Sequence, residues 1–263
     1  MARRPMPVRD SAPRPKEKDA SEIIFGFRAA MAVFATRPND VSRVGYARER
    51  AIDANELVTW AVAHRVPCDE LAESELGRIS NSTHHEGLVV RAAPRKWSSM
   101  SDFADAMIRA RGFAVALDRV RNPYNVGAIL RSAAFFGLEG ALLGALAPHP
   151  ALAPDAIRVA EGGAEYLRLA RSTDLVDTLD RLRGRGVRVV GGESDATDSL
   201  FGHPFRGPLV LVLGHEREGL SRAVRAACDA VVAIPGSGNI ESLNVGIAAS
   251  LCIAEMARSR PRA

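Results

Sequence analysis

The stretch 121-RNPYNVGAILRSAAFFG-137 decides how the larger part of this chain is interpreted. It opens with residues that favour turns, and we expect Pro123 and Gly127 to shape that turn. The apolar residues from Asn125 to Phe136 recur at helical spacing, and Gly137 is a typical helix stop. One charged residue, Arg131, lies in the early turns of this otherwise apolar helix. On spacing alone, Asn125 can be a simple N-cap and Arg131 a surface residue.

Six strand-like segments are spaced regularly around this helix. Helical patterns separate most of them, and one of these patterns, 172–186, is expected to be capped by Ser172. Alternation of strands and helices predicts an α/β fold with a mostly parallel sheet, covered by helices on both faces. The six segments are 113–120, 140–144, 165–170, 187–192, 209–214 and 230–235.

The N-terminal third predicts a separate small α/β domain over residues 21–93. It contains two helical and two strand patterns, at 25–36 and 55–65 and at 41–47 and 86–93. Residues 94–112 are expected to form a linker and a short helix that Ser101 caps and Gly112 ends. Residues 1–20 are Pro-rich and charged, which predicts a disordered basic tail. The remaining residues, 113–263, form the second domain of this scheme.

The composition is that of a globular protein and excludes several classes. No apolar run reaches the roughly 18 residues of a membrane span, and the first residues lack the apolar core of a secretory signal. The three cysteines are scattered, so we expect reduced thiols in a cytoplasmic protein. The net charge of +4 is compatible with a polyanionic partner, although the excess of Arg over Lys is better explained by a GC-rich coding sequence.

Ligands of open α/β sheets bind beyond the carboxyl ends of the strands, so the loops after the strands are the candidate sites. The first is the stretch quoted above. The second is 209-LVLVLGHEREGLS-221, in which Gly214 is expected to let the backbone approach a ligand and Glu216 to lie at the sheet edge. His215 and Glu216 are not part of an HExxH pattern, so we interpret His215 as a loop residue and expect no metal.

The third loop is 231-VVAIPGSGNIESLNVGIAASLCIAEMAR-258, where a strand runs through a Gly-rich loop into a long apolar helix. We expect Glu241, Ser242 and Asn244 in the first turn of that helix, where free N–H groups bind anions or carbonyls. Gly236 and Gly238 suggest a dinucleotide loop. However, the GxGxxG pattern is incomplete and only one helix of chain follows, which argues against an oxidoreductase.

The three loops together resemble the motifs of the SpoU/TrmH family of RNA 2′-O-ribose methyltransferases, in the SPOUT superfamily. The matching segments are NPYNVGAILRSAAFFG, LVLGHEREGLS and IPGSGNIESLNVGIA, and their order and spacing match over residues 113–258. More faintly, FGFRAA and HHEGLVV resemble the small substrate-binding domain of that family. The resemblance implies a trefoil-knotted cofactor site, which periodicity alone would not suggest because knots are rare.

The resemblance further implies a homodimer that uses S-adenosyl-L-methionine to methylate a ribose 2′-hydroxyl in rRNA or tRNA. Matched motif to motif, the family's catalytic positions fall on Asn125, Arg131, Glu216, Ser242 and Asn244. Cofactor binding falls on Leu213, Gly214, Ile234, Gly238 and Leu243. The chain departs from the family pattern at three positions, where Asn122, Gly236 and Glu86 stand in place of the common Asp, Met and Gln.

Methyl transfer from a sulfonium is an in-line displacement, so the protein must align the nucleophile and help a hydroxyl lose its proton. A guanidinium with a pKa above about 12 resists deprotonation, so we expect Arg131 to grip a phosphate and stabilise the forming alkoxide. Glu216 can orient Arg131 or the hydroxyl, and Ser242 and Asn244 would hold the substrate and the loop. The alternative is a non-catalytic RNA-binding or ribosome-assembly factor with the same fold, which the five intact positions argue against.

Overall fold

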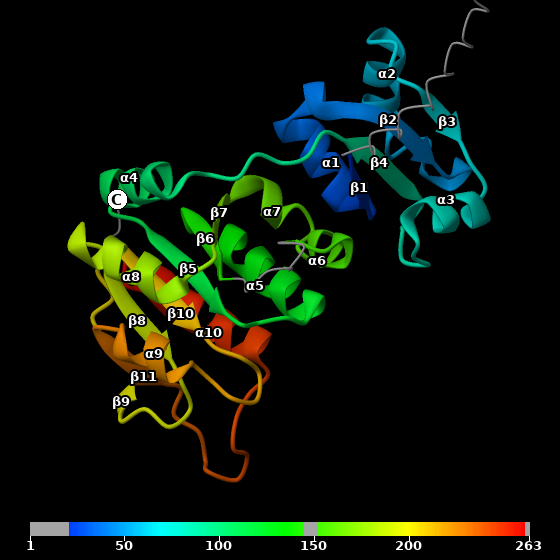
Figure 1. Cartoon of the computed structure of the whole chain (residues 1–263). Helices are drawn as coiled ribbons and strands as arrows, with labels where there is room; N and C mark the ends of the chain where they lie inside the picture. The colour runs from blue at the N-terminus through cyan, green and yellow to red at the C-terminus, as the bar shows by residue number, and fades with distance from the viewer. Residues whose placement is uncertain (1–20, 145–151, 261–263) are drawn as a thin grey trace, which may run out of the picture.

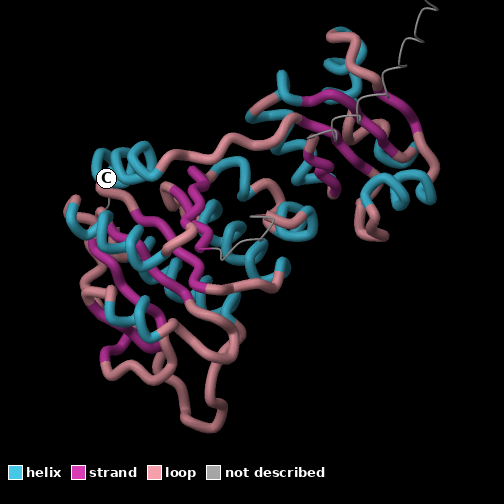
Figure 2. The backbone as a smooth tube through the Cα atoms, viewed as in Figure 1, coloured by secondary structure: helices cyan, strands magenta, loops and turns pink. Residues whose placement is uncertain are grey.

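The computed structural model describes residues 21–144 and 152–260, which form a smaller and a larger α/β unit (Figure 1). The predicted tail, residues 1–20, lies outside the described residues. In Figure 2 the strands of each unit lie beside each other, and helices cover them.

The smaller unit contains a four-stranded sheet with the order β1-β4-β2-β3. Strand β4 pairs antiparallel with β1 and β2, and β2 pairs parallel with β3. The prediction of a small α/β domain is therefore correct in type, although it missed β1, β3 and α3. The elements are β1 (Glu22–Phe25), α1 (Phe27–Thr36), η1 (Pro38–Asp40), β2 (Val41–Tyr46), η2 (Arg48–Arg50), α2 (Asn55–Ala63), β3 (Cys68–Glu70), α3 (Glu73–Ser80) and β4 (Leu88–Ala92).

The larger unit contains a seven-stranded sheet with the order β7-β6-β5-β10-β8-β11-β9. Every pair in it is parallel, which confirms the predicted α/β fold with a mostly parallel sheet. Its strands are β5 (Phe113–Asp118), β6 (Gly140–Gly144), β7 (Arg168–Ser172), β8 (Arg188–Gly192), β9 (Asp198–Ser199), β10 (Leu209–Leu213) and β11 (Ala230–Ala233). Its helices are α4 (Met100–Ala110), α5 (Pro123–Phe135), α6 (Pro154–Val159), α7 (Gly163–Tyr166), α8 (Leu175–Gly184), α9 (Arg222–Ala226) and α10 (Val245–Arg258).

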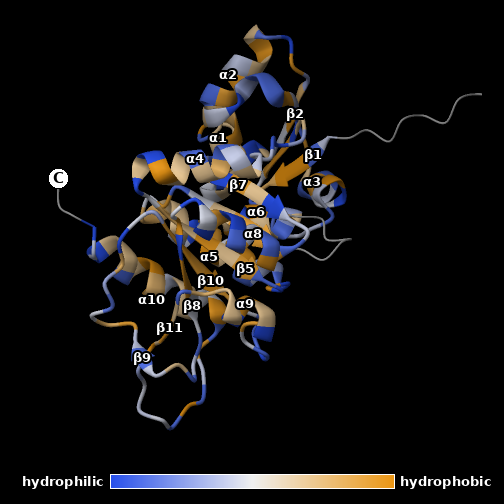
Figure 3. Ribbon diagram, turned by 60° about the vertical axis from the view of Figure 1, so that its left-hand side comes forward, coloured by the Kyte–Doolittle hydropathy of each residue, from blue (hydrophilic) through white to orange (hydrophobic). Residues whose placement is uncertain are grey.

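Helices bury both faces of this sheet, which is why its central strands are continuously apolar (Figure 3). One core joins α5, α6 and α10 to the sheet through residues such as Ile129, Ala156 and Ile253. The other core joins α4, α8 and α9 to the opposite face through residues such as Phe103 and Leu179. Helix α4 thus packs into the larger unit.

Several predicted helix ends are wrong because a nearer side chain reaches the free N–H groups. Ser99 rather than Ser101 caps α4, accepting from Asp102 N, and Asp174 rather than Ser172 caps α8. Helix α10 begins at Val245, so Glu241 and Ser242 precede it instead of lying in its first turn. The segment predicted as a strand at 165–170 starts as helix α7 and becomes strand β7 only at Arg168.

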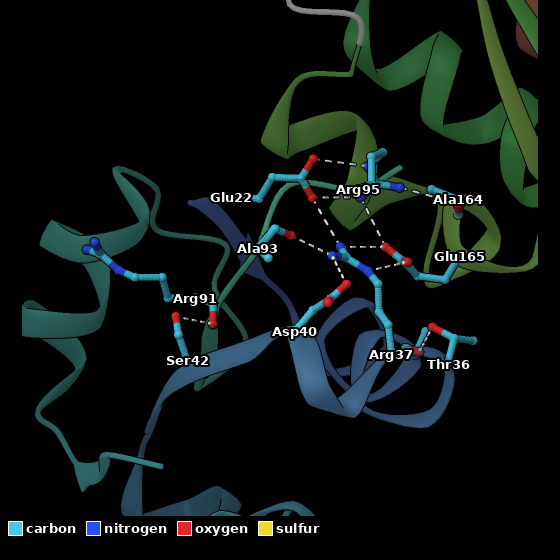
Figure 4. Close-up of polar contacts among 11 residues, drawn as sticks. Glu22, Thr36, Arg37, Asp40, Ser42, Arg91, Ala93, Arg95, Ala164 and Glu165 are labelled. Carbon is cyan, nitrogen blue, oxygen red and sulfur yellow. Dashed lines mark hydrogen bonds and ion pairs between the residues drawn. The ribbon is translucent and has the colours of Figure 1, made fainter. Parts of the chain in front are cut away.

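Buried charges hold the two units together (Figure 4). The interdomain ion network consists of Glu22, Arg37, Arg95 and Glu165, with distances of 2.9 Å from Arg37 Nε to Glu165 Oε2 and 3.0 Å from Arg95 Nη2 to Glu165 Oε1. The side chains of Arg95 and Glu165 are only 6% and 5% exposed. Because removing one member would leave its partner buried and unpaired, this network constrains how α1, which Arg37 follows, lies against the larger unit.

Gly127 lies inside α5 and does not shape the preceding turn, contrary to the prediction. A Cβ atom at this position would stand 2.6 Å from Val159 Cβ and 2.7 Å from Ala156 O, both on α6. The glycine therefore permits the close approach of α6 to α5. Pro123 is also part of α5 and does not lie in a turn before it, since it occupies the first turn of the helix, where its missing N–H needs no partner.

Replacing Gly127 with alanine should destabilise the protein, because α6 cannot accommodate the added methyl group. We expect a loss of about 1–3 kcal/mol in the free energy of unfolding, the usual cost of overpacking. Urea denaturation measures it. The matched control is Gly184→Ala in α8, where a Cβ would meet nothing within 4 Å. That control should be neutral or stabilise by up to about 1 kcal/mol. Equal stability of the two variants would contradict the tight α5–α6 contact.

Candidate functional site

The loops that carry the predicted site residues leave the same edge of the sheet. Strands β5, β10 and β11 are parallel, so their carboxyl ends and the loops that follow them share that edge. These are the loops before α5, after β10 and between β11 and α10. The sheet therefore gathers three segments that lie far apart in the chain.

The side chain of Asn125 joins these three segments. Its Nδ2 donates to Glu216 Oε1 at 2.9 Å, and its Oδ1 accepts from Asn244 Nδ2 at 3.0 Å. A carboxylate only accepts hydrogen bonds, so Asn125 must turn its amide nitrogen to Glu216 and its oxygen to Asn244. Asn125 is only 8% exposed, and both ends of its amide are satisfied. We refer to this pair of hydrogen bonds as the Asn125 bridge.

The flanking asparagines have separate capping roles. Asn122 is the N-cap of α5 and accepts from Tyr124 N at 2.9 Å, so the simple N-cap interpretation of Asn125 is wrong. Asn244 is the N-cap of α10 and accepts from Gly246 N at 2.9 Å. Asn244 therefore fixes the start of α10 with its oxygen and binds Asn125 with its nitrogen. The first turn of α5 and the start of α10 are linked by the same amide pair.

The loop after β10 is a tight turn that presents Glu216. His215 and Gly219 exchange two backbone hydrogen bonds of 2.9 Å, and a Cβ at Gly214 would lie 2.2 Å from the Gly219 carbonyl carbon. Gly214 thus makes room for the loop's own backbone, and its approach to a ligand stays a prediction. His215 Nδ1 accepts from Arg217 N at 3.3 Å, which confirms it as a loop residue.

Side chains from neighbouring strand ends brace this turn, although the sequence pattern did not single them out. Asp118 at the end of β5 accepts from Ser221 N at 2.7 Å, and Arg119 Nη2 donates to Gly219 O at 3.1 Å. Asp118 is 5% exposed. The criterion that selected Glu216 was its place in a loop after a buried strand, and extending it to the last residue of the strand would have selected Asp118 as well.

The loop between β11 and α10 projects from the larger unit (Figure 1). Ile234 at its start packs against the core, as does the buried Leu213 of β10. Gly238, Ser242 and Leu243 are exposed, and Gly238 has a φ of +83°. The structure therefore places the predicted cofactor residues in two groups, one at the strand ends and one along the projecting loop.

Arg131 lies on the side of α5 that borders the segment between α6 and α7. Its Nη1 is 2.8 Å from Glu161 Oε1, and its side chain is 54% exposed. Glu216, a candidate for orienting Arg131, contacts Asn125 instead. Nothing in the sequence pattern pointed to Glu161, because it follows a short helix that the pattern does not predict.

The strand ends and the projecting loop fit a nucleoside cofactor. Ile234 is partly buried against the core, Leu213 is only 3% exposed, and Leu243 is 47% exposed although it is apolar. A Cβ at Gly236 or Gly238 would meet nothing within 4 Å, so the backbone there is open to a ligand. The departure at Gly236 from the common Met therefore leaves the loop without a bulky side chain at this point.

Other expectations can be compared with the described residues. Within residues 21–144 and 152–260, no group of three or more His, Cys, Asp or Glu side chains could hold a metal ion. In the same ranges, no helix is long and apolar enough to cross a membrane. The three cysteines are free, and burial raises the pKa of Cys228 and Cys252 to about 12, which leaves both thiols protonated and unreactive at neutral pH.

Comparisons with known families match both units. Residues 112–254 match the model of the SpoU rRNA Methylase family. Residues 23–98 match the model described as RNA 2′-O ribose methyltransferase substrate binding. The two matches together cover most of the described chain.

Individual relatives agree with these matches. The chain is 31% identical over 246 residues to the 23S rRNA (guanosine-2′-O-)-methyltransferase RlmB of Photobacterium profundum, covering 92% of this chain and 99% of that relative. It is 36% identical over 252 residues to an uncharacterized tRNA/rRNA methyltransferase of Mycobacterium sp. (strain KMS), covering 94% of this chain and 80% of the relative. The solved SpoU methyltransferase AviRb from Streptomyces viridochromogenes, in complex with AdoMet, superposes with a TM-score of 0.74 at 25% identity, covering 91% and 90% of the two chains.

The Asn125 bridge predicts a large difference between two conservative substitutions. Asn125→Asp removes the donor to Glu216 and sets two carboxylates against each other, so we expect a loss of about 1–3 kcal/mol in the free energy of unfolding at pH 7. Asn122→Asp is the control, because Asp caps helices as well as Asn, and it should change stability by less than about 0.5 kcal/mol. Denaturant unfolding of both variants measures this. Equal stabilities would show that the bridge is not formed in solution.

Proposed function

The chain belongs to the SpoU rRNA methylase family, and we propose that it transfers a methyl group from S-adenosyl-L-methionine to a ribose 2′-hydroxyl in structured rRNA or tRNA. The observation that carries this proposal is the Asn125 bridge, which joins the three motif segments at one edge of the sheet. Almost the whole chain aligns with the 23S rRNA (guanosine-2′-O-)-methyltransferase RlmB, and this similarity supports ribose methylation as the reaction. The smaller unit would bind the RNA, as its family match suggests.

The cofactor supplies an electrophilic methyl group when it is bound. We assign its binding to Leu213 and Ile234 at the strand ends, to the backbone at Gly214 and Gly238, and to Leu243 of the projecting loop. The apolar side chains suit the adenine, and the open backbone at Gly238 offers N–H and C=O groups to its polar edges.

The reaction needs a group that stabilises the oxygen as it loses its proton. Arg131 is a permanent cation whose pair with Glu161 is half exposed, so this pair is weak and can be exchanged for a phosphate. We assign to Arg131 the grip on the phosphate beside the target ribose and the stabilisation of the forming alkoxide.

Glu216 and its neighbours would position the hydroxyl. Its Oε1 is held by Asn125, while its Oε2 lies 3.9 Å from His215 Nε2 and can accept from the ribose hydroxyl. Asn244 would keep the start of α10 in place, and Ser242 in the exposed loop would contact the substrate. In this account Asn125 is a positioning residue that acts through Glu216 and Asn244.

We also propose that the protein is a homodimer. Phe135, Ile247 and Leu251 are 81%, 55% and 39% exposed on the packed helices α5 and α10. We refer to these three residues as the apolar patch, since exposed apolar side chains on neighbouring helices are typical of an interface. A second copy of the chain is the proposed occupant, because family members pair through this region.

We also propose the trefoil knot of the family and a cellular location for this protein. After β11 the chain returns to the other half of the sheet, where α10 packs against α5, and such a crossing is compatible with the trefoil knot of the family. We further propose a cytoplasmic location, where both classes of RNA and the cofactor occur.

Arg131→Ala should lower the single-turnover rate of methyl transfer by roughly 100-fold or more, the scale for losing one preorganised stabilising group. The assay uses labelled S-adenosyl-L-methionine and rRNA and tRNA from cells lacking the gene, and scores label in nucleotides that resist alkaline cleavage. Cofactor affinity should not change, and Arg131→Lys should recover little activity because Lys lacks the two-pronged donor.

Arg181→Ala is the matched control for that experiment. Arg181 is an exposed helical arginine that pairs with Asp177 at 2.9 Å on α8, which covers the opposite face of the sheet. It should retain the wild-type rate. A wild-type rate for Arg131→Ala would remove Arg131 from the site, and cofactor binding by the wild-type protein without methylation of any RNA would favour the non-catalytic alternative.

Ile247→Asp should convert the dimer to a monomer, because it places a charge in the middle of the apolar patch. Light scattering at micromolar concentration measures the mass. Ile52→Asp is the control, since Ile52 is 89% exposed in the smaller unit and should leave the dimer intact. A wild-type protein that is monomeric in this range would overturn the proposed dimer.

A further inference from the structure

Two arginines from different units converge on one carboxylate. Arg28 Nη1, from α1 of the smaller unit, lies 2.8 Å from Glu161 Oε2. Arg131 Nη1, from α5 of the larger unit, lies 2.8 Å from Glu161 Oε1. Each oxygen of Glu161 is therefore held by a different arginine, and the carboxylate connects the smaller unit to the residue assigned to the reaction.

The backbone at Glu161 is held in an unfavourable conformation. Its φ of +46° is in the left-handed region, which a non-glycine residue adopts at a cost of order 1 kcal/mol and only where the surroundings enforce it. The next residue, Gly162, has a φ of +91°, and a Cβ there would stand 2.6 Å from Ala32 Cβ on α1. A Cβ at Gly163 would lie 3.1 Å from Arg131 Cα on α5. This turn thus packs tightly between α1 and α5, and this packing places Glu161 between the two arginines.

The position of Arg28 is fixed from the other end of α1. Arg37, directly after that helix, belongs to the interdomain ion network shown in Figure 4 and is 14% exposed. A helix held at Arg37 by buried charges presents Arg28, near its start, in a constant place relative to Glu161. The convergence of the two arginines therefore follows from the packing of the units as well as from the surface ion pairs.

The three side chains are open to solvent and hence to a ligand. Arg28 is 70% exposed, Arg131 54% and Glu161 31%. Exposed ion pairs contribute only about 0–1 kcal/mol each, so another anion can replace Glu161 at little cost. Guanidinium groups bind phosphate as they bind carboxylate, through paired N–H donors. With Glu161 turned away, the two arginines would offer two positive charges to one phosphate.

A cavity of about 490 Å³ lies mostly within the smaller unit, with walls that include Arg50 and Glu86, and Arg158 of the larger unit closes it. Arg28, Arg131 and Glu161 are not among its lining residues. Glu86 accepts from Phe27 N in the first turn of α1, and Arg158 Cγ would be 2.8 Å from a Cβ at Gly26. Charged residues of both units therefore lie beside Gly26 and Phe27, which directly precede Arg28 in the chain.

We propose that Arg28 and Arg131 form a binding site for an RNA backbone phosphate across the two units, and that Glu161 occupies this site in the RNA-free protein. The inference rests on the proposed function, since it extends the phosphate grip of Arg131 to a second residue. Glu161 is then an internal competitor of the RNA, and it keeps both arginines in place until the phosphate arrives.

The test compares Arg28→Ala and Glu161→Gln in the full-length protein. The probe is rRNA from cells lacking the gene, and the dissociation constant is measured over a range of salt concentrations without cofactor. Arg28→Ala should weaken binding about 5–10-fold and reduce the salt slope by about 1, because one phosphate contact is lost. Glu161→Gln should instead tighten binding about 3-fold, because the competing charge is removed while both arginines remain.

The opposite sign of the two effects is the decisive readout. If Glu161 were only a structural link between the units, both substitutions would break the same link, and both would weaken binding or leave it unchanged. That result would overturn the proposal. Arg28→Lys provides a second variant, which should retain the salt slope but bind more weakly than the wild-type protein.

The matched controls are Arg181→Ala and Asp177→Asn. This exposed pair has a similar separation of 2.9 Å, but both residues lie on α8, which covers the opposite face of the large sheet. Each control should change the dissociation constant less than about 2-fold, because an exposed ion pair contributes little. Changes as large as those at Arg28 and Glu161 would show that only the net charge of the protein matters, and they would refute the site. Because binding is measured without methyl transfer, failure of this site and failure of the proposed reaction give different results.

Discussion

The hydrogen bonds of the Asn125 amide are the interaction on which the rest of the site depends. They join the start of α5, the loop after β10 and the start of α10, although the partners are 91 and 119 residues away in the chain. A parallel sheet brings these segments to one edge but does not fix their side chains. Asn125, with one donor and one acceptor group in a fixed arrangement, sets Glu216 and Asn244 relative to each other. The tight turn at Gly214 holds the loop that presents Glu216.

The sequence predicts the parts of this site that follow from strand and loop order. Glu216 and Asn125 could be placed at the sheet edge because each follows an apolar strand in an alternating α/β pattern. The cap of α5 is ambiguous in the sequence, since Asn122 and Asn125 are equally good capping residues, and only the tertiary contacts with Glu216 and Asn244 separate them. Likewise, Gly127 lies in a stretch whose composition favours a turn. Its actual role depends on α6, a helix of six residues, which is too short to be predicted from its sequence pattern.

The contacts between the two units lay beyond sequence analysis for a different reason. Glu161 lies 133 residues from Arg28, and its left-handed backbone is enforced by packing, not by its residue type. Charges of the interdomain ion network look like ordinary surface residues in the sequence, and only the fold buries them. These charges fix how the smaller unit lies against the part of the larger unit that carries Arg131.

The central claim is that this protein methylates a ribose 2′-hydroxyl in RNA. A map of the ribose methylations in the cell tests it most directly. Total RNA from the source organism would be compared between the wild type, a strain lacking the gene, and that strain with the gene restored. The account predicts that at least one 2′-O-methyl group in rRNA or tRNA is absent from the deletion strain and returns with the gene. Identical ribose-methylation maps in all three strains would contradict it.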